Sequence, residues 1–203
     1  MPRTEKVNQQ IREETTDKIL TAARKVFAHR GMSAKIAEVA TEAGISQGLA
    51  YHYFPSKEAI FVALLRQMTR TPEELEHIAQ QVPGAPGERL NRIISSMVER
   101  RRADPEFFQF FSQAMADDNL PPDVRRDVYA QGVHMQKILR RLMVEGQATG
   151  EIAKDDPDEL LQAIMACLDG LSRMAFSSLE RTANHLPNTR IILRMLRPDQ
   201  SEE

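Results

Sequence analysis

The apolar residues of this chain recur at intervals of three and four positions over almost its whole length. The first such stripe comprises Ile19, Ala23, Val26 and Phe27, and it ends at Gly31, a residue type that often terminates helices. No stretch alternates apolar and polar residues between turn signals, as a half-buried strand would. The sequence therefore predicts an all-α fold of about nine helices, with three in the first 54 residues and longer ones after them.

Several helix starts are marked by a proline that follows a capping residue type. Pro72, Pro105 and Pro157 each come directly after a threonine or an aspartate. The first of these predicts that the helix opened by Ser56 breaks near residue 71. Residues 82–87, with the sequence VPGAPG, are predicted to form a loop.

Composition limits the class of protein. The chain has 203 residues, of which 41% are apolar and 28% charged, enough for a substantial core. No apolar run approaches the roughly 20 residues of a membrane span, and residues 1–12 lack the apolar region of a secretion signal. The single cysteine, Cys167, cannot form an internal disulfide. We therefore expect a cytoplasmic protein without a membrane partner, in which Cys167 is a packing residue.

The charges are divided unevenly along the chain. Residues 1–70 contain 11 Lys or Arg and 7 Asp or Glu, whereas the remainder contains 16 and 22. A basic N-terminal part on an acidic body is expected if only that part meets phosphate, although ordinary scatter gives similar differences.

Residues 36–54 contain two short helical segments separated by a turn at Gly44. Such a pair is either a helix-turn-helix or a simple helical corner. After Ser46, a capping type, the first turn of the second helix holds Gln47, Gly48 and Leu49, and this turn of a recognition helix reaches base edges. Glutamine pairs with adenine, and leucine contacts the thymine methyl group. A glycine in a helix costs about 1 kcal/mol, which close approach to DNA would explain.

Three consecutive ring residues follow, namely Tyr51, His52 and Tyr53. Successive helical positions point in different directions, so at least one ring faces outward, where it can donate to phosphate oxygens. Lys57 begins the next helix, a position that favours a nearby anion. The alternatives are hydrophobic packing for the tyrosines and a solvated surface position for Lys57.

Residues 18–65 resemble the N-terminal domain of the TetR family of bacterial repressors. The matching strings are KILTAARKVFAHRG and IAEVATEAGISQGLAYHYFPSKEAIFVALL. The resemblance implies a DNA-binding domain at 1–58 and a helical effector-binding and dimerisation domain at 59–203. It also implies a ligand-responsive regulator, most often a repressor, that binds a palindromic operator as a homodimer.

The resemblance assigns DNA contacts to individual positions. Those at the start of the recognition helix and along the groove are Ser46, Gln47, Gly48, Leu49 and His52. Those on phosphates are Lys35, Tyr51, Tyr53 and Lys57. The chain departs from the family before this motif, where segment 32–35 is one residue short and has Ala34 in place of the usual threonine. Ser33 is the candidate cap in its place.

Four phenylalanines fall within five positions, at Phe107, Phe108, Phe110 and Phe111, and cannot all face one core. Core packing explains part of the set, and a cavity for an apolar or amphipathic effector explains the rest, since methionine-rich linings adapt to varied ligands. The candidate effector residues are Met97, Phe107, Phe111, Met115 and Met135.

The segment 160–179 is apolar on nearly all sides, which predicts burial on all sides and hence a subunit interface. A second apolar stripe covers 191–196. The candidate dimer contacts are Leu161, Met165, Leu168, Ile192 and Met195.

An enzymatic reading finds little support. A helical di-iron site needs two Glu-x-x-His motifs, and the chain has one, from Glu74 to His77. It has no phosphate-binding glycine loop and no nucleophile elbow. The sequence therefore predicts no catalytic residue, no cofactor and no metal. A di-iron-type protein or a small-molecule-binding helical module without DNA function remains the alternative.

Overall fold

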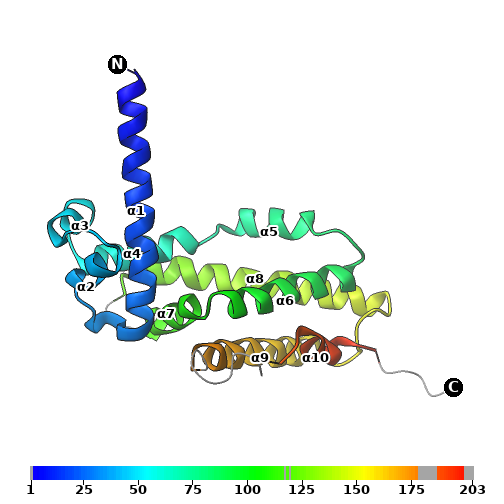
Figure 1. The fold of residues 1–203 in the computed structure, drawn as a ribbon. Helices are drawn as coiled ribbons and strands as arrows, with labels where there is room; N and C mark the ends of the chain where they lie inside the picture. The colour runs from blue at the N-terminus through cyan, green and yellow to red at the C-terminus, as the bar shows by residue number, and fades with distance from the viewer. Residues whose placement is uncertain (1, 117, 119, 178–186, 199–203) are drawn as a thin grey trace. The chain divides into compact units, whose positions relative to one another are not determined.

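The computed structural model describes residues 2–116, 118, 120–177 and 187–198. Every regular element in these ranges is a helix, and the prediction of an all-α fold is confirmed. The chain divides into two compact units (Figure 1). The first unit joins Met1–Thr69 to Gln109–Arg125, and the second joins Arg70–Phe108 to Arg126–Glu203.

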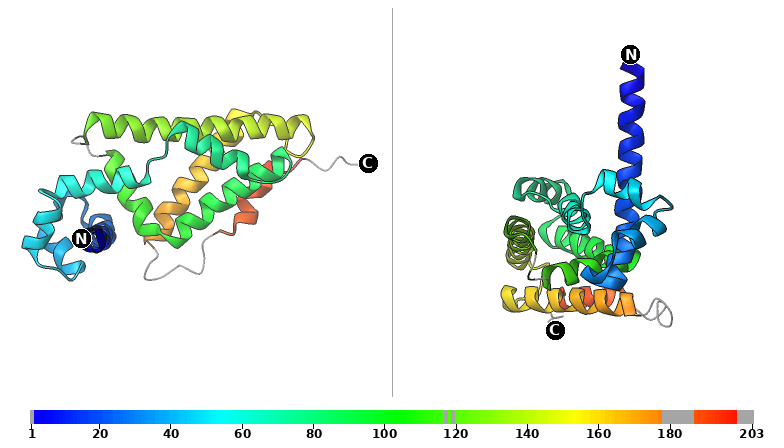
Figure 2. Two further views of the ribbon diagram at one scale, coloured as in Figure 1. Left: turned by 90° about the horizontal axis from the view of Figure 1, so that it is seen from above. Right: turned by 90° about the vertical axis from the view of Figure 1, so that its left-hand side faces the viewer.

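The first unit contains the helices that precede the predicted break near residue 71. They are α1 (Pro2–Arg30), the short 3-10 helix η1 (Gly31–Ser33), α2 (Ile36–Glu42), α3 (Gln47–Tyr53) and α4 (Lys57–Met68). In the left view of Figure 2, α1 is seen end-on beside α2, α3 and α4.

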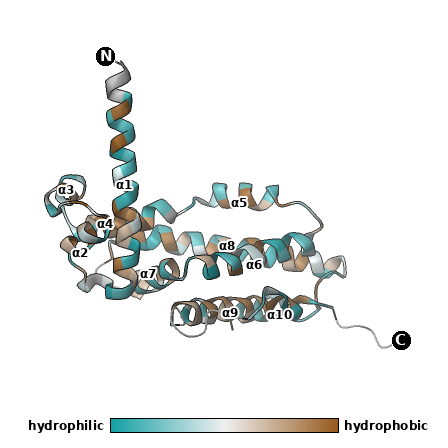
Figure 3. Cartoon of the chain, viewed as in Figure 1, coloured by the Kyte–Doolittle hydropathy of each residue, from teal (hydrophilic) through white to brown (hydrophobic). Residues whose placement is uncertain are grey.

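Helix α1 begins 17 residues before Ile19, where the apolar stripe starts. Its N-terminal half is mostly hydrophilic (Figure 3), so no apolar pattern revealed it. Side-chain bonds one turn apart support it, because Gln9 Nε2 donates to Glu13 Oε1 at 2.7 Å and Gln10 Nε2 donates to Glu14 Oε1 at 2.9 Å. The helix ends at Gly31, as predicted, where φ of +56° favours a residue without a side chain.

The core of the first unit is organised around three aromatic rings. Phe27 of α1 lies 5.6 Å from Phe61 of α4 between ring centroids, and both rings contact Phe110, at 6.0 and 5.0 Å. All three side chains are almost completely buried. Phe110 comes from a helix that begins more than 30 residues after α4.

That helix, α7, contributes to both units, and so does α8. The helices that lie wholly or partly in the second unit are α5 (Pro72–Gln81), α6 (Pro86–Ala103), α7 (Pro105–Ala116), α8 (Pro122–Ala148), α9 (Pro157–Ser177), α10 (Thr189–Leu193) and the 3-10 helix η3 (Arg194–Leu196).

The predicted caps explain where these helices begin. Thr71 Oγ1 accepts from the Glu74 amide at 3.2 Å, and Glu74 Oε2 accepts from the Thr71 amide at 2.8 Å. This capping box opens α5, so the predicted break after α4 is present. Asp104 and Asp156 likewise cap α7 and α9. The predicted loop is shorter than expected, because α6 already begins at Pro86, where proline suits the first turn.

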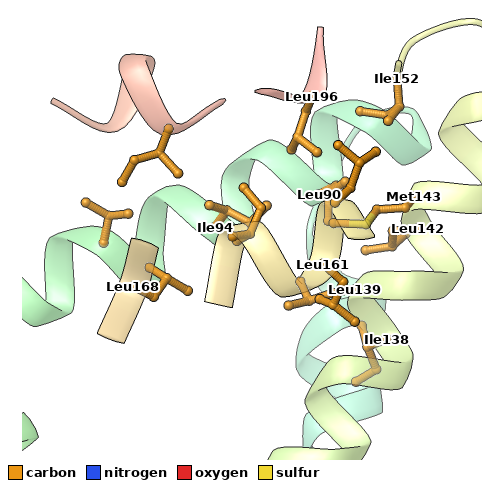
Figure 4. Close-up of a cluster of buried hydrophobic side chains, with 14 of the residues drawn as sticks. Leu90, Ile94, Ile138, Leu139, Leu142, Met143, Ile152, Leu161, Leu168 and Leu196 are labelled. Carbon is orange, nitrogen blue, oxygen red and sulfur yellow. The ribbon is translucent and has the colours of Figure 1, made fainter. Parts of the chain in front are cut away.

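The second unit has one continuous apolar core (Figure 4). Leu90 and Ile94 of α6 meet Leu139 and Leu142 of α8, and Leu168 of α9 lies in the same cluster. These five side chains are fully buried.

Three of the candidate dimer contacts belong to this core. Leu161, Leu168 and Ile192 are buried within their own chain, and Met165 and Met195 pack partly buried against the cluster. The apolar character of α9 is therefore already explained to a large extent by packing inside the subunit. Dimerisation through these residues stays a prediction.

The candidate effector residues are divided between the two units. Met97 and Met135 pack against the core of the second unit, and Phe107 contacts Phe108 with ring centroids 4.5 Å apart. Phe111 and Met115 lie in the part of α7 that belongs to the first unit. A common effector pocket for the five residues stays a prediction.

Candidate nucleic-acid interface

Helices α2 and α3 are joined by a tight turn. Gly44 adopts φ of +65° there, a conformation that side chains rarely allow, and the Ile45 amide donates to the carbonyl of Ala40 at 3.0 Å. This glycine is therefore required by the backbone of the turn.

The start of α2 differs from the expectation. Lys35 is the N-cap, and its backbone amide donates to Glu38 Oε2 at 2.8 Å. The suggestion that Ser33 caps this helix is wrong, since its hydroxyl donates to the Arg30 carbonyl at 2.6 Å within η1. The Lys35 side chain is exposed at the N-terminus of α2.

The start of α3 agrees with its capping pattern. Ser46 Oγ accepts a hydrogen bond from the Leu49 amide at 3.1 Å, which fixes the first turn. Ala50 is the buried residue of α3, with none of its surface exposed, so the helix rests on the unit through this position.

The rest of α3 presents a continuous surface. Leu49 is 39% exposed and Tyr51 49% exposed, which is high for large apolar or aromatic side chains. The helix contains no carboxylate. The predicted groove and phosphate residues that are exposed on it are Gln47, Gly48, Leu49, Tyr51 and His52.

Within the part of the chain that the structure describes, no neighbouring atom requires a glycine at position 48. A Cβ atom built on it would meet nothing within 4 Å, and its φ is not positive. The glycine thus carries its helix-propensity cost without a compensating contact in the protein, and the space above it is open to an external molecule.

Tyr53 and Lys57 are only half-buried and lie at the far end of the motif. The rings of His52 and Tyr53 meet edge-on with centroids 5.6 Å apart. Lys57 is the first residue of α4, whose cap Ser56 accepts from the Ala59 amide at 3.1 Å. Of the nine predicted DNA-binding residues, seven thus lie on α3 or at its N-cap, while Lys35 precedes α2 and Lys57 begins α4.

One neighbouring feature was missed by the sequence reasoning. A cleft of about 450 Å³ separates the N-terminal half of α1 from the end of α3. Its lining consists of Asn8, Gln9, Arg12, His52 and Tyr53. No apolar periodicity marks residues 8–12, so only the tertiary structure places them beside α3.

The second unit has a cavity of about 300 Å³ between α6 and the C-terminal helices. Its lining includes Asn91 and Ser95 of α6 together with Arg190 and Arg197. None of the five candidate effector residues lines it.

Arg101 of α6 is a further buried group that the sequence did not single out. It is 9% exposed, its Nη1 donates to the Met97 carbonyl at 3.1 Å, and its guanidinium lies 4.5 Å from the ring centre of Phe108. Burial lowers the pKa of Arg101 from its ordinary value, and the charge of Asp169 partly opposes this. The second unit therefore holds a cation in a largely apolar setting.

The residues of the Glu-x-x-His motif have other partners. Glu74 caps α5, and Glu76 Oε1 accepts from Arg141 Nη2 at 2.7 Å, which lowers the pKa of Glu76. Within the described ranges, no three His, Cys, Asp or Glu side chains gather as a metal site would require. No described helix is both long and apolar enough to span a membrane.

Comparison with known proteins agrees with this geometry. The profile of "Bacterial regulatory proteins, tetR family" matches residues 19–64, which contain α2 and α3. The profile "Tetracyclin repressor-like, C-terminal domain" matches residues 83–173. The chain is 26% identical over 158 residues to the HTH-type transcriptional regulator BetI of Rhizobium meliloti, covering 75% of this chain and 73% of that protein. It is also 26% identical to the HTH-type transcriptional repressor NicS of Pseudomonas putida, covering 74% and 71%.

Solved structures share the fold. The regulator MbdR from Azoarcus sp. CIB superimposes with a TM-score of 0.71 at 23% identity, over 90% of this chain and 97% of that one. FadR from Bacillus subtilis, solved with stearoyl-CoA, gives a TM-score of 0.63 at 22% identity, over 89% and 96%. Three findings agree. Two successive family profiles match the chain, the helix-turn-helix has an exposed second helix, and the fold is shared with solved regulators. The chain belongs to the TetR family of bacterial transcriptional regulators and is a DNA-binding regulator, not an enzyme.

Proposed function

We propose that the protein is a ligand-responsive repressor that binds a palindromic operator as a homodimer, with α3 as the recognition helix. The observation that carries this proposal is the surface of α3. Five of its seven residues are exposed, while Ala50 alone is fully buried and anchors the helix. A helix held at one position and exposed elsewhere is suited to enter the major groove.

The contacts are assigned by position on the helix. Gln47 and Leu49, in the first turn, read base edges, and Gly48 lets the backbone approach. Tyr51 and Tyr53 donate to phosphates on either side of the groove, with Lys57 and Lys35 adding charge. These roles follow the family resemblance and the exposure of each side chain.

The test is a footprint on the DNA beside the gene, followed by binding titrations on the protected site. The repressor proposal predicts a palindromic protected sequence and an affinity that falls steeply with salt. Gln47→Ala is expected to reduce discrimination at one base pair of each half-site by about 1–3 kcal/mol. The matched control is Gln67→Ala, an exposed glutamine of α4 in the same unit, which is expected to bind as the unmodified protein does.

Two outcomes decide the proposal. If Gln47→Ala and Gln67→Ala lose binding equally, the assignment of α3 as the recognition helix is contradicted. Absence of specific binding to any duplex, with mass measurements at micromolar concentration giving a monomer, contradicts the operator-binding dimer altogether.

We further propose that the effector is an amphipathic molecule with an apolar chain and an anionic end. Met97 and Met135, which pack partly buried against the core of the second unit, suit the chain, and the buried Arg101 suits the anion. The Bacillus subtilis protein of the same fold was solved with stearoyl-CoA, so a long-chain acyl-CoA is the first probe.

The response to the effector is measured as the loss of operator binding when the effector is added. Stearoyl-CoA is expected to lower the operator affinity, and free coenzyme A, which lacks the apolar chain, is the control. The variants Met135→Ala and Met97→Ala are expected to raise the concentration of acyl-CoA needed for release. Unchanged responses in both variants to every effector that acts on the unmodified protein contradict this pocket.

A further inference from the structure

We propose that the cleft between the N-terminal half of α1 and the end of α3 binds a phosphate of the DNA backbone at the flank of the half-site. This inference rests on the proposed function and extends it to a segment outside the family match, which begins at residue 19. The occupant is the DNA strand that runs past the C-terminal end of the recognition helix.

The geometry places polar groups of two helices around one space. Asn8 and Arg12 are one turn apart and so lie on the same side of α1, together with Gln9. The facing wall consists of His52 and Tyr53, the last two residues of α3. The cleft of about 450 Å³ is therefore continuous with the helix assigned to the groove.

The charge of the lining favours an anion. Within the described part of the chain, no hydrogen bond or ion pair engages the Arg12 guanidinium, and the cleft lining contains no carboxylate. The two nearest acids of α1, Glu13 and Glu14, accept hydrogen bonds from glutamine side chains one turn before them. A guanidinium with neighbouring amide, imidazole and phenol groups matches the oxygens of a phosphate.

The dimensions favour a backbone phosphate over a base. Base edges are read from the first turn of α3, whereas His52 and Tyr53 lie at the opposite end of this seven-residue helix, which is about 10 Å long. Residues at its end, and side chains beyond that end, therefore meet the strand that borders the groove. Arg12 approaches the end of α3 from outside and is placed to meet that strand.

The first test compares Arg12→Gln with Lys18→Gln on the operator defined by footprinting. Both variants remove one positive charge from an exposed position of α1, but Lys18 does not line the cleft. Arg12→Gln is expected to weaken binding about tenfold, as for a lost charge-assisted hydrogen bond. It is also expected to reduce the steepness of the salt dependence by about one phosphate contact per protomer. Lys18→Gln is expected to change neither quantity appreciably.

The second test adds one negative charge to α1, either inside the cleft or outside it. Asn8→Asp places a carboxylate in the cleft, whereas Gln10→Glu, two positions away, places one outside it. A phosphate in the cleft predicts weaker binding for Asn8→Asp alone. Circular dichroism checks that all four variants keep the helix content of the unmodified protein.

The outcomes separate this inference from the function on which it rests. If the unmodified protein binds the operator and the two members of each pair behave alike, the cleft holds no phosphate and the repressor assignment stands. If Arg12→Gln alters release by acyl-CoA but not operator affinity, the cleft serves the effector instead of DNA and the inference is overturned. If the unmodified protein binds no duplex specifically, the proposed function itself fails.

Discussion

The ring of Phe61 in α4 meets the ring of Phe110 in α7 edge-on, with centroids 5.0 Å apart and planes at 71°. Phe110 stands far along the chain from the helix-turn-helix, yet its ring packs in the aromatic core of the same unit. The core of the unit that contains α3 is thus complete only when part of α7 packs against α1 and α4. Because the first residues of α7 belong to the second unit, one helix contributes to both.

Truncating Phe110 is therefore expected to damage the DNA-binding unit. Phe110→Ala removes a fully buried ring and is expected to cost about 3–5 kcal/mol of unfolding free energy. Hydrogen exchange of α1 and α4 amides measures the effect locally. Phe107→Ala, whose ring contacts Phe108 in the other unit, is the control and is expected to leave those amides protected. Equal protection in both variants would contradict the aromatic core described above.

Replacing Gly48 with alanine is expected to change stability and DNA binding in opposite directions. The new methyl group meets no atom within 4 Å, so the helix gains about 1 kcal/mol. The same methyl group occupies space needed for approach to the groove, so operator affinity falls. Gly132→Ala in α8 is the matched control, since its Cβ also meets nothing, and it is expected to gain stability with unchanged binding. Titrations and urea denaturation of the two variants check both signs.

Replacing Gly146 of α8 with alanine is expected to lower stability, whereas Gly48→Ala raises it. A Cβ there would lie 2.6 Å from Ile152 Cγ1 and 3.4 Å from the Cα of Gly87, so the buried isoleucine must move. Gly146→Ala is therefore expected to destabilise the second unit by about 1–3 kcal/mol, as overpacking does. Urea denaturation measures it, and a gain in stability would show that α6 and α8 do not approach this closely.

Stability is expected to depend on pH through Asp158. Arg140 of α8 donates to both carboxylate oxygens of this residue, at 2.8 and 3.0 Å, and thereby lowers the pKa of Asp158. A carboxyl group with a lowered pKa stabilises the fold above its ordinary pKa and loses that contribution as the pH falls through the lowered value. Asp158→Asn is thus expected to unfold at lower urea than the unmodified protein at pH 7. The ordinary aspartate pKa is about 4. The difference between the two proteins is expected to shrink below that pH and to vanish only below the lowered pKa of Asp158.

Local chemistry in the sequence determined much of this protein. The helical period, the capping residues Thr71, Asp104 and Asp156, and the glycines at positions 31 and 44 act within one or two turns. They therefore predicted the all-α fold, the break before α5 and the position of α3 after the turn at Gly44. The polar start of α1 was missed because a solvated helix shows no apolar stripe, and the Ser33 cap was wrong because η1 uses that hydroxyl.

The tertiary structure alone decided which side of each helix is covered. Four phenylalanines in a row of five give no indication that Phe110 joins Phe27 and Phe61 while Phe107 turns to Phe108. Likewise, the apolar residues of α9 look alike in sequence, yet Leu168 is buried by its own chain. The cleft at Arg12 also exists only because a distant part of the chain folds beside α1. Burial depends on contacts between residues far apart in sequence, which no local pattern encodes.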